Sequence, residues 1–301
     1  MNEIIIHEVG MRDGLQAENE IVPTETKIKW IEELYRTGVD IIQIGSFVNP
    51  KRMPQMADTD ELFRILKEKS DKPKNVALAG LVLNEKGLER GIQCGVEMFC
   101  MGVSASDTHS QKNTGMSTLE ALDRIIPMAK NAMASNKVVQ LSVQSAFGCG
   151  YEGKIPESRV IGIVEKYLEN DLKMINLADT AGHANPGQVE RIFSEIYKLS
   201  DDVNCACHFH DTFGMGLANA YAAYITGVKY FESSFAGLGG CPFTALASGN
   251  VCTEDLVHMF QNMDIRKDIK IEVLSQLSKQ ASEFLKRELP GVIYKTGIIS
   301  S

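Results

Sequence analysis

The sequence predicts an α/β fold in which eight parallel strands, each followed by a helix, close into a (β/α)8 TIM barrel. Short, continuously apolar runs alternate with longer amphipathic runs along the whole chain, which is the pattern of a parallel sheet covered by helices. Eight such pairs can be counted, and polar residues gather just after the strand-like runs. An open doubly wound sheet is the alternative fold.

The expected strands are short runs rich in Val, Ile, Leu and aromatic residues. The first is "EIIIHEV" and the second is "DIIQIGSF". Runs of this length and composition, bounded by polar residues and glycines, are typical of buried parallel strands. The eight runs cover residues 3–9, 40–47, 75–83, 97–104, 138–147, 173–180, 204–212 and 229–237.

The expected helices are the amphipathic runs between these strands. Six cover residues 24–35, 59–69, 85–94, 118–134, 215–226 and 253–261. Two more open at Pro156 and near Pro186, because proline has no amide hydrogen to lose in a first helical turn. Residues 268–288 form a further amphipathic helix that caps the barrel or packs across its rim. We therefore expect residues 1–301 to be a single catalytic barrel domain, with residues 268–301 as a C-terminal helical extension.

Composition excludes several classes of protein. The chain has 301 residues and a net charge of −8, which opposes binding to nucleic acid or to an anionic membrane surface. No apolar run is long enough to cross a bilayer, and the strand at residue 3 leaves no room for a targeting peptide, so we expect a cytoplasmic protein. The seven cysteines are an odd number and are interpreted as reduced thiols.

Polar side chains follow several of the expected strands. In a barrel of this kind the loops after the carboxyl ends of the strands carry the chemistry. The sequence places there Arg12, Asp13 and Gln16 after the first strand, Gln43 and Ser46 in the second, Asp179 after the sixth, "HFHDTFG" after the seventh and "AGLGGCPFTALASGN" after the eighth.

The pair His208 and His210 is the strongest metal signal. Two positions apart on a strand, both imidazoles point to one face, while Cys205 and Cys207 point to the other. Asp13 supplies a carboxylate oxygen from another strand end, which suits a divalent cation. The alternative is that both histidines are hydrogen-bonded core residues.

Three other residues each have a structural and a functional interpretation. Arg12 is either half of a salt bridge at the barrel mouth or a fixed cation that faces a developing oxyanion. Asp179 either binds the amides of its own turn or takes part in chemistry. Cys241 lies in the glycine-rich loop, which is a plain connection, a weakly supported phosphate cradle or a lid that carries a proton-transferring thiol.

Six stretches resemble one family over nearly the whole chain: "VGMRDGLQAENEIVPTETKI", "SFVNPKRMPQMAD", "FGCGYEGKI", "LADTAGHANPG", "HFHDTFGMGLANA" and "AGLGGCPFTALASGNVCTEDLVHM". The chain resembles the 3-hydroxy-3-methylglutaryl-CoA lyases, within a superfamily of metal-dependent aldolase-like barrels. The R-D-G and H-x-H motifs are shared across that superfamily. The cysteine-bearing loop and the S-G-N-V-x-T-E-D stretch after it are particular to the lyases.

The resemblance implies retro-Claisen-type cleavage of 3-hydroxy-3-methylglutaryl-CoA to acetoacetate and acetyl-CoA, as in leucine degradation. It implies Mg²⁺ or Mn²⁺ as cofactor and an acyl-CoA as the binding partner, with no other cofactor, and we expect a homodimer or higher homo-oligomer. The implied metal ligands are Asp13, His208, His210 and Asn250. The implied catalytic residues are Arg12, which faces the thioester carbonyl, with Asp179, Cys241 and His208, and the implied substrate-binding residues are Arg12, Gln16, Gln43 and Ser46.

Gln43 departs from the resemblance, because the lyases carry a glutamate at this place. A neutral amide can neither act as a base nor pair ionically with Arg12. The alternatives are therefore a related acyl-CoA lyase with another branched 3-hydroxyacyl substrate, or a weakly active paralogue. A synthase that runs the condensation, and a metal-bound scaffold without activity, are the remaining hypotheses.

Overall fold

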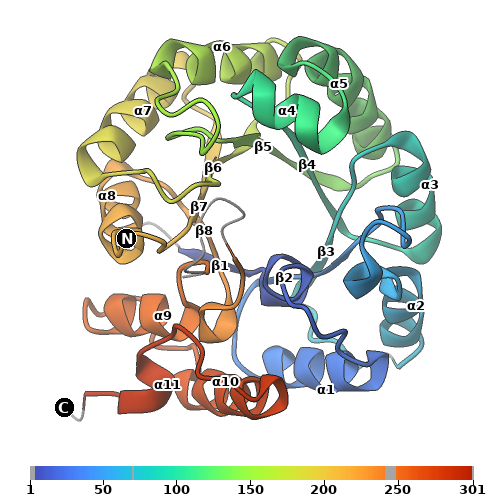
Figure 1. The fold of residues 1–301 in the computed structure, drawn as a ribbon, viewed down its shortest axis with the longest axis vertical. Helices are drawn as coiled ribbons and strands as arrows, with labels where there is room; N and C mark the ends of the chain where they lie inside the picture. The colour runs from blue at the N-terminus through green and yellow to red at the C-terminus, as the bar shows by residue number, and fades with distance from the viewer. Residues whose placement is uncertain (1–3, 70, 241–248, 300–301) are drawn as a thin grey trace.

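The structure is a computed structural model that describes residues 4–69, 71–240 and 249–299. Its eight strands are all parallel to their neighbours and close into a barrel in chain order, with β8 paired to β1 (Figure 1). This confirms the predicted (β/α)8 barrel and excludes an open sheet. The strands are β1 Ile5–Glu8, β2 Ile41–Ser46, β3 Ala77–Leu81, β4 Met98–Ser104, β5 Val138–Gln144, β6 Met174–Asp179, β7 Asn204–Phe209 and β8 Tyr230–Ser233.

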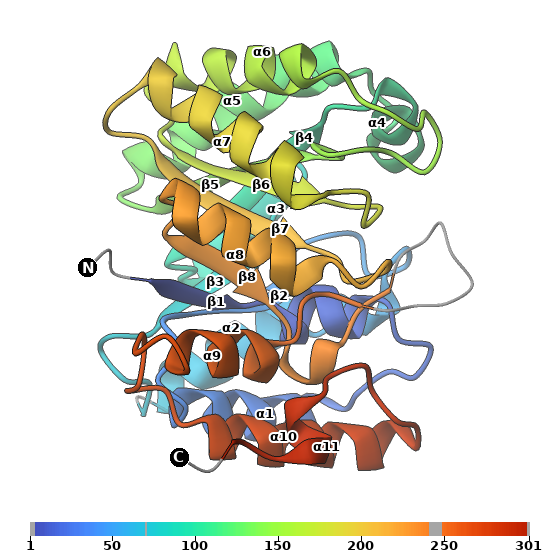
Figure 2. The same ribbon diagram turned by 90° about the vertical axis from the view of Figure 1, so that its left-hand side faces the viewer.

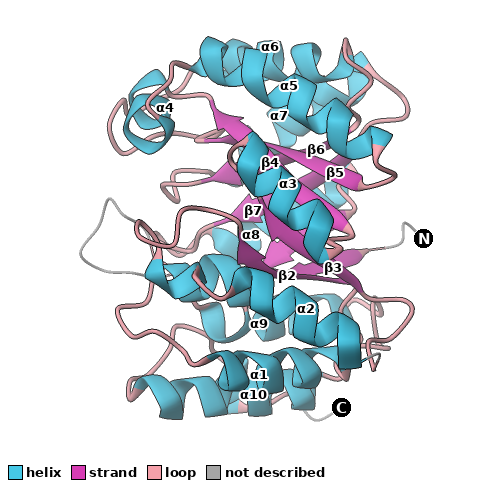
Figure 3. Ribbon diagram, turned by 90° about the vertical axis from the view of Figure 1, so that its right-hand side faces the viewer, coloured by secondary structure: helices cyan, strands magenta, loops and turns pink. Residues whose placement is uncertain are grey.

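Helices surround this barrel on its outer side, as the two side views show (Figures 2 and 3). Helix α4 was not predicted, because it is short and polar with no apolar stripe, and its start depends on the Ser106 side chain, which accepts from the amide of His109. The helices are α1 Thr24–Tyr35, α2 Thr59–Lys69, α3 Glu85–Cys94, α4 Asp107–Thr114, α5 Thr118–Ala134, α6 Glu157–Leu168, α7 Pro186–Leu199, α8 Gly216–Thr226, α9 Thr253–Gln261, α10 Ile271–Leu285 and α11 Ile293–Thr296.

The interior of the barrel changes character along its axis. Nearer the amino ends of the strands, Ile41, Ala79 and Met98 form an apolar cluster, which Cys100 joins from the floor of the cavity. Toward the carboxyl ends, the buried inward-facing residues are polar and include Gln140 and Glu232. The amino half of the barrel is therefore packed for stability, and the carboxyl half is available for chemistry.

The C-terminal helix α10 supports the turn that follows β8. It packs against α1, α9, α11 and the 3₁₀ turn Phe235–Gly237. Trp30 of α1 makes edge-to-face contacts with Phe235, at 5.9 Å between ring centroids, and with Phe284 of α10, at 5.7 Å. The assignment of residues 268–301 as an extension of a single domain stays a prediction. Among the described helices, none combines the length and apolar character that crossing a bilayer requires.

Arg266 ties the segment before α10 to the amino end of the barrel. Its guanidinium donates to the carbonyl oxygens of Ile4 and Gly38 at 2.7 and 2.8 Å, and to Asp40 at 2.6 Å. Asp40 in turn accepts from the amide of Ile6 in β1 at 2.8 Å. One mostly buried side chain thus fixes β1, the start of β2 and the C-terminal segment together.

We predict that Arg266→Met lowers the free energy of unfolding by about 2–4 kcal/mol, because it leaves Asp40 without its cation and two buried carbonyls without donors. Urea unfolding followed by circular dichroism measures this. The control is Arg124→Met, which breaks an exposed pair with Glu85 and should cost at most about 1 kcal/mol. Equal small losses for both variants would refute the structural role of Arg266.

Candidate metal centre and active site

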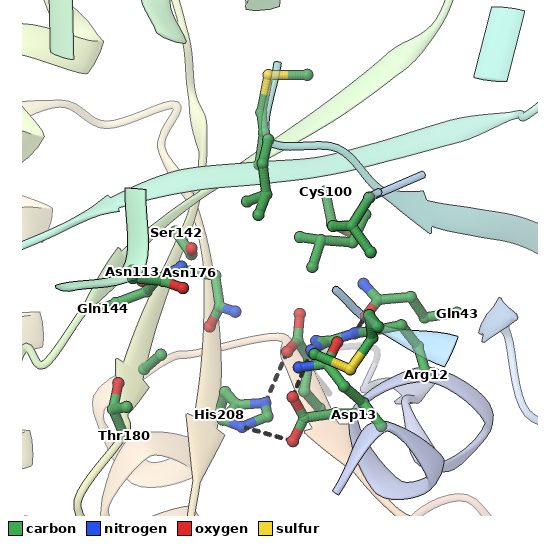
Figure 4. Close-up of a pocket in the computed structure, with 18 of the residues that line it drawn as sticks. Arg12, Asp13, Gln43, Cys100, Asn113, Ser142, Gln144, Asn176, Thr180 and His208 are labelled. Carbon is green, nitrogen blue, oxygen red and sulfur yellow. Dashed lines mark hydrogen bonds and ion pairs between the residues drawn. The ribbon is translucent and has the colours of Figure 1, made fainter. Parts of the chain in front are cut away.

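A cavity of about 910 Å³ lies at the carboxyl ends of the strands (Figure 4). Side chains from every strand or from the loop that follows it line this cavity, so all the strand ends converge on one site. The polar lining residues are Arg12, Asp13, Gln16, Gln43, Asn49, Arg52, Asn84, His109, Asn113, Gln140, Ser142, Gln144, Asn176, Thr180, His208, His210 and Glu232.

Three of the predicted metal ligands meet at this cavity. Asp13 lies in a π-helical turn, Gly10–Gly14, directly after β1, and His208 is the penultimate residue of β7. The Nε2 atoms of His208 and His210 are 3.2 Å apart, and they lie 3.9 and 4.0 Å from one Asp13 carboxylate oxygen. Ligand atoms so spaced can share one ion, since bonds of about 2 Å to a divalent cation bring its ligands this close.

The side chains on the opposite face of β7 confirm the predicted alternation along this strand. Cys205 and Cys207 are both 1% exposed and belong to the apolar core outside the barrel wall. Burial raises the pKa of the Cys205 thiol to about 12 and that of Cys207 well above its usual value, so neither is a thiolate. The cysteines therefore pack, while the histidines face the cavity.

Glu232 orients His208, one of the predicted metal ligands. The two residues are opposite each other in the β7–β8 register, and Nδ1 of His208 lies 2.8 Å from a Glu232 oxygen. Glu232 also lies opposite His7 in the β8–β1 register, at 3.4 Å, and accepts from Gln140 across the barrel. A proton held on Nδ1 by this carboxylate leaves the Nε2 lone pair free to bind a metal.

The pKa values of the ionisable residues around His208 are consistent with that arrangement. Burial by itself would raise the pKa of Glu232, but the hydrogen bond from His208 and the nearby positive groups lower it to about 2. Burial and the neighbouring His208 lower the pKa of His210 to about 4, so His210 is neutral near pH 7. Burial also opposes ionisation of Asp13, yet Arg12 and the two histidines hold its pKa well below its usual value. A carboxylate and a neutral imidazole thus face the site.

Arg12 lies between the triad and Gln43. One of its terminal nitrogens donates to Asp13, and its Nε donates to the amide oxygen of Gln43. Its side chain is 11% exposed and lines the cavity. Gln43 therefore positions the guanidinium without adding a charge. The ion pair with Asp13 matches the structural interpretation of Arg12, and its role opposite a developing oxyanion stays a prediction.

Asn250 contacts the carboxylate of Asp13. Its amide nitrogen donates to Asp13 at 2.9 Å and to the carbonyl of Leu238 at 3.0 Å, and its backbone bridges to His210. Its amide oxygen is buried and has no hydrogen-bond partner among the described residues. The predicted fourth ligand is therefore adjacent to the triad through its amide nitrogen, and its role as a metal ligand stays a prediction.

The glycine-rich loop is held at its described ends. Gly239 has a φ of +128°, and a Cβ there would lie 2.6 Å from the Asn250 amide. Ala236 adopts a left-handed φ of 58° and donates its amide to Glu254 at 3.1 Å. Gly240 lines the cavity. Cys241 lies outside the described residues, so its predicted role stays a prediction.

Three of the described residues that were predicted for the site do not line the cavity: Asp179, Ser46 and Asn250. Asp179 accepts hydrogen bonds from the backbone amides of His183 and Ala184 at 2.8 and 3.1 Å, as the structural interpretation of this residue expects. Burial raises the pKa of its carboxyl group to about 7. Alternation along β6 explains its absence from the cavity lining, since Ala178 and Thr180 line the cavity on either side of it. Ser46 is fully buried, and its backbone amide donates to the Thr59 hydroxyl at 3.1 Å. Gln16 and Gln43 do line the cavity.

Sequence reasoning missed Glu232, Gln140 and Asn176. Each of these residues lies within an expected strand. That its side chain points into the barrel follows only from the register of the strands. A polar residue inside a continuously apolar strand was the available signal.

The comparisons with known proteins cover almost all of the chain. A family model described as HMGL-like matches residues 3–280. Hydroxymethylglutaryl-CoA lyase YngG of Bacillus subtilis is 39% identical, over 96% of this chain and 95% of the relative. A (R)-citramalyl-CoA lyase of Chloroflexus aurantiacus is 35% identical, over 99% and 96%.

A solved structure is similar over the same extent. It is an HMG-CoA lyase from Acinetobacter baumannii, described as a complex with coenzyme A and 3-methylmalate. It superimposes with a TM-score of 0.91 at 37% identity and covers 99% of this chain and 96% of its own.

We predict that Glu232→Gln weakens Mn²⁺ binding about 10- to 100-fold, because the amide has one acceptor oxygen where the carboxylate has two, and His208 loses its fixed orientation. Titration of Mn²⁺ followed by electron paramagnetic resonance measures the affinity directly. Glu85→Gln, which alters an exposed carboxylate, is the matched control and should leave the affinity unchanged. Unaltered binding by the Glu232 variant would refute its orienting role.

Proposed function

The chain belongs to the HMGL-like family of carbon–carbon lyases, and we propose that it cleaves 3-hydroxy-3-methylglutaryl-CoA to acetoacetate and acetyl-CoA with the help of a divalent metal. The observation that carries this proposal is the convergence of Asp13, His208 and His210 beside Arg12 in one cavity. The name of the Bacillus subtilis relative and the coenzyme A in the Acinetobacter structure support an acyl-CoA substrate.

The donor set fits Mg²⁺ or Mn²⁺. A carboxylate oxygen of Asp13 and the imidazole nitrogens of His208 and His210 lie close enough to share one ion, and this mixture of oxygen and nitrogen donors suits either metal. When bound, such an ion supplies Lewis acidity that lowers the pKa of a coordinated hydroxyl. The thiols of Cys205 and Cys207, which a zinc site would use, face away from it.

The chain's own residues provide the rest of the proposed mechanism. The guanidinium of Arg12 binds the thioester carbonyl and stabilises the negative charge that develops there as the C2–C3 bond breaks. Gln43 holds this guanidinium in place through its Nε. Glu232 keeps the Nδ1 proton of His208 away from the reacting atoms. The proton that must reach C2 of the acetyl-CoA enolate is assigned to Cys241 by resemblance alone.

Asp179 is a weaker candidate for proton transfer than the resemblance implies. Its oxygens are engaged by the amides of its own turn, and it is absent from the cavity lining. We therefore propose that Asp179 maintains the β6 loop and that its neighbour Thr180 is the residue of this turn that reaches the cavity.

A second candidate function is cleavage of a related 3-hydroxyacyl-CoA. The observation that favours it is Gln43, whose neutral amide replaces the family's carboxylate beside Arg12. Named relatives of this chain include an (R)-citramalyl-CoA lyase and a 3-hydroxy-3-isohexenylglutaryl-CoA lyase, so members of the family differ in the acyl group that they cleave.

We predict that the purified protein forms acetoacetate and acetyl-CoA from 3-hydroxy-3-methylglutaryl-CoA when Mg²⁺ or Mn²⁺ is present, and that EDTA abolishes this activity. The physical reason is that the triad by itself supplies no Lewis acid. Asp13→Asn serves as a matched variant and should require a higher metal concentration. Product formation that EDTA leaves intact would contradict metal dependence. No product under any condition would favour either the second candidate function or a scaffold without activity.

We further predict that Gln43→Glu raises the turnover of this substrate about tenfold. A carboxylate here pairs ionically with Arg12 and can also hold a proton, which an amide cannot. Initial rates at saturating substrate test this, with the Mn²⁺ affinity measured alongside to exclude a change at the metal. An unchanged or lower turnover would instead favour the second candidate function.

A further inference from the structure

The carboxyl group of Glu8 joins three segments that surround the site. Glu8 is the last residue of β1 and is fully buried. One of its oxygens accepts hydrogen bonds from the backbone amides of Gly10 at 2.6 Å and Phe235 at 3.1 Å, and the other lies 2.5 Å from the Thr253 hydroxyl. These three partners begin the π-helical turn after β1, the 3₁₀ turn after β8 and helix α9.

The joined segments carry or flank predicted functional groups. The π-helical turn presents Arg12 and Asp13 to the cavity, and the 3₁₀ turn and the start of α9 lie on either side of the glycine-rich loop. Only a glycine fits at Gly10, because a Cβ there would lie 2.7 Å from the Glu8 oxygen and 2.6 Å from the Phe235 ring. Glu8 therefore fixes the turn of Arg12 and Asp13 against both flanks of the loop.

Among the residues that the structure describes, no cation pairs with this carboxyl group. Glu254 acts on Glu8 instead, and it is a second fully buried carboxyl group. Both oxygens of Glu254 lie 3.1 Å from the backbone amide of Ala236, the residue after Phe235. Two buried carboxyl groups thus bind consecutive amides of one turn, and a charge on either opposes a charge on the other.

The other ionisable side chains on the contacting segments leave a charge on Glu8 unbalanced. Those toward the barrel interior pair with one another, and those at the start of α9 are a buried thiol and an acid. They are His7 with Glu232 and Arg12 with Asp13 on the inner side, and Cys252 and Asp255 at α9. Because a buried charge without a partner is unfavourable, burial raises the pKa of Glu8 to about 8 and that of Glu254 to about 7. Glu8 is therefore protonated near pH 7.

The contacts of Glu8 suit a neutral carboxylic acid. The Thr253 hydroxyl lies within hydrogen-bond distance of two oxygens, that of Glu8 and that of Ser233 at 2.9 Å, but it has only one proton to donate. When Thr253 donates to Ser233, Glu8 supplies the proton of the other contact. The second Glu8 oxygen then remains the acceptor for both backbone amides, so all of these donors have acceptors.

We propose that Glu8 is a positioning residue that works as a neutral carboxylic acid, and that its ionisation in alkaline solution releases the turn of Arg12 and Asp13 from both flanks of the glycine-rich loop. The proton passes to the solvent, and the carboxylate that remains faces Glu254 without a cation, so water enters or the segments separate. The kinetic consequence rests on the proposed lyase function, whereas the structural consequence does not.

The only tryptophan of the chain reports on this junction. Trp30 is buried, and its ring centroid lies 5.9 Å from that of Phe235, whose amide binds Glu8. We expect the fluorescence of Trp30 to change with a midpoint near pH 8 in the wild-type protein. Glu8→Gln keeps the hydrogen bonds of the neutral acid and should abolish this transition. Glu85→Gln alters an exposed carboxylate and is the matched control that should retain it.

A second variant tests the same claim should Glu8→Gln fail to fold. The hydrogen bond with Thr253 lowers the pKa of Glu8, since it favours the ionised form. Thr253→Val removes this bond at similar volume and should therefore move the midpoint of the Trp30 transition to higher pH.

The kinetic test uses 3-hydroxy-3-methylglutaryl-CoA with saturating Mn²⁺. In the wild-type protein kcat/KM should fall about tenfold for each pH unit above the same midpoint, and Glu8→Gln should lack this alkaline limb. At pH 7 Glu8→Gln should lower kcat/KM no more than about threefold, whereas Glu8→Leu, which can bind none of the three partners, should lower it at least about tenfold.

Each outcome decides a stated claim. A Trp30 transition that persists in Glu8→Gln overturns the inference, and its loss in Glu254→Gln alone would assign the transition to the neighbouring carboxyl group. A wild-type protein without any transition in mildly alkaline solution overturns it as well. The expected fluorescence without cleavage of the substrate defeats the lyase proposal and leaves the role of Glu8 at the junction standing. A transition near pH 8 that Glu8→Gln abolishes and Thr253→Val raises supports the inference.

Discussion

The site depends on the closure of the barrel between its last and first strands. This closure places Glu232 of β8 between His208 of β7 and His7 of β1, in one row of the strand register. The Glu232 carboxylate sets the proton on His208, and the loop that leaves β1 then delivers Arg12 and Asp13 beside it. Without a closed sheet, these side chains would lie at opposite edges.

The same carboxylate connects His208 to the opposite wall of the barrel through Gln140. One of its oxygens lies against His208, a predicted metal ligand, and the other accepts from Gln140. The barrel interior has three layers along its axis. An apolar layer lies at the amino ends of the strands, and a row of polar residues that fixes proton positions follows it. The predicted metal ligands and Arg12 lie at the carboxyl ends. The neutral amides of Gln43, Gln140 and Asn176 add no charge to the lining of the cavity.

Much of this was predictable from the sequence, and the reason differs from one element to another. The strands and most of the helices follow from periodicity, and α2 and α5 have the predicted bounds. The convergence of His208 and His210 follows from alternation along a strand. Helix α4 was missed because polar capping, not an apolar stripe, defines it. The direction of Asp179 and the meeting of Glu232 with His208 depend on register, which one sequence does not reveal.

The central claim is that Asp13, His208 and His210 bind one divalent cation. The most direct measurement is a crystal structure of the protein grown with Mn²⁺, with anomalous data collected near the manganese edge. The account predicts a single peak about 2.0–2.4 Å from one Asp13 oxygen and from the Nε2 atoms of both histidines. A cavity without an anomalous peak at saturating Mn²⁺, or a peak bound by other residues, would contradict it.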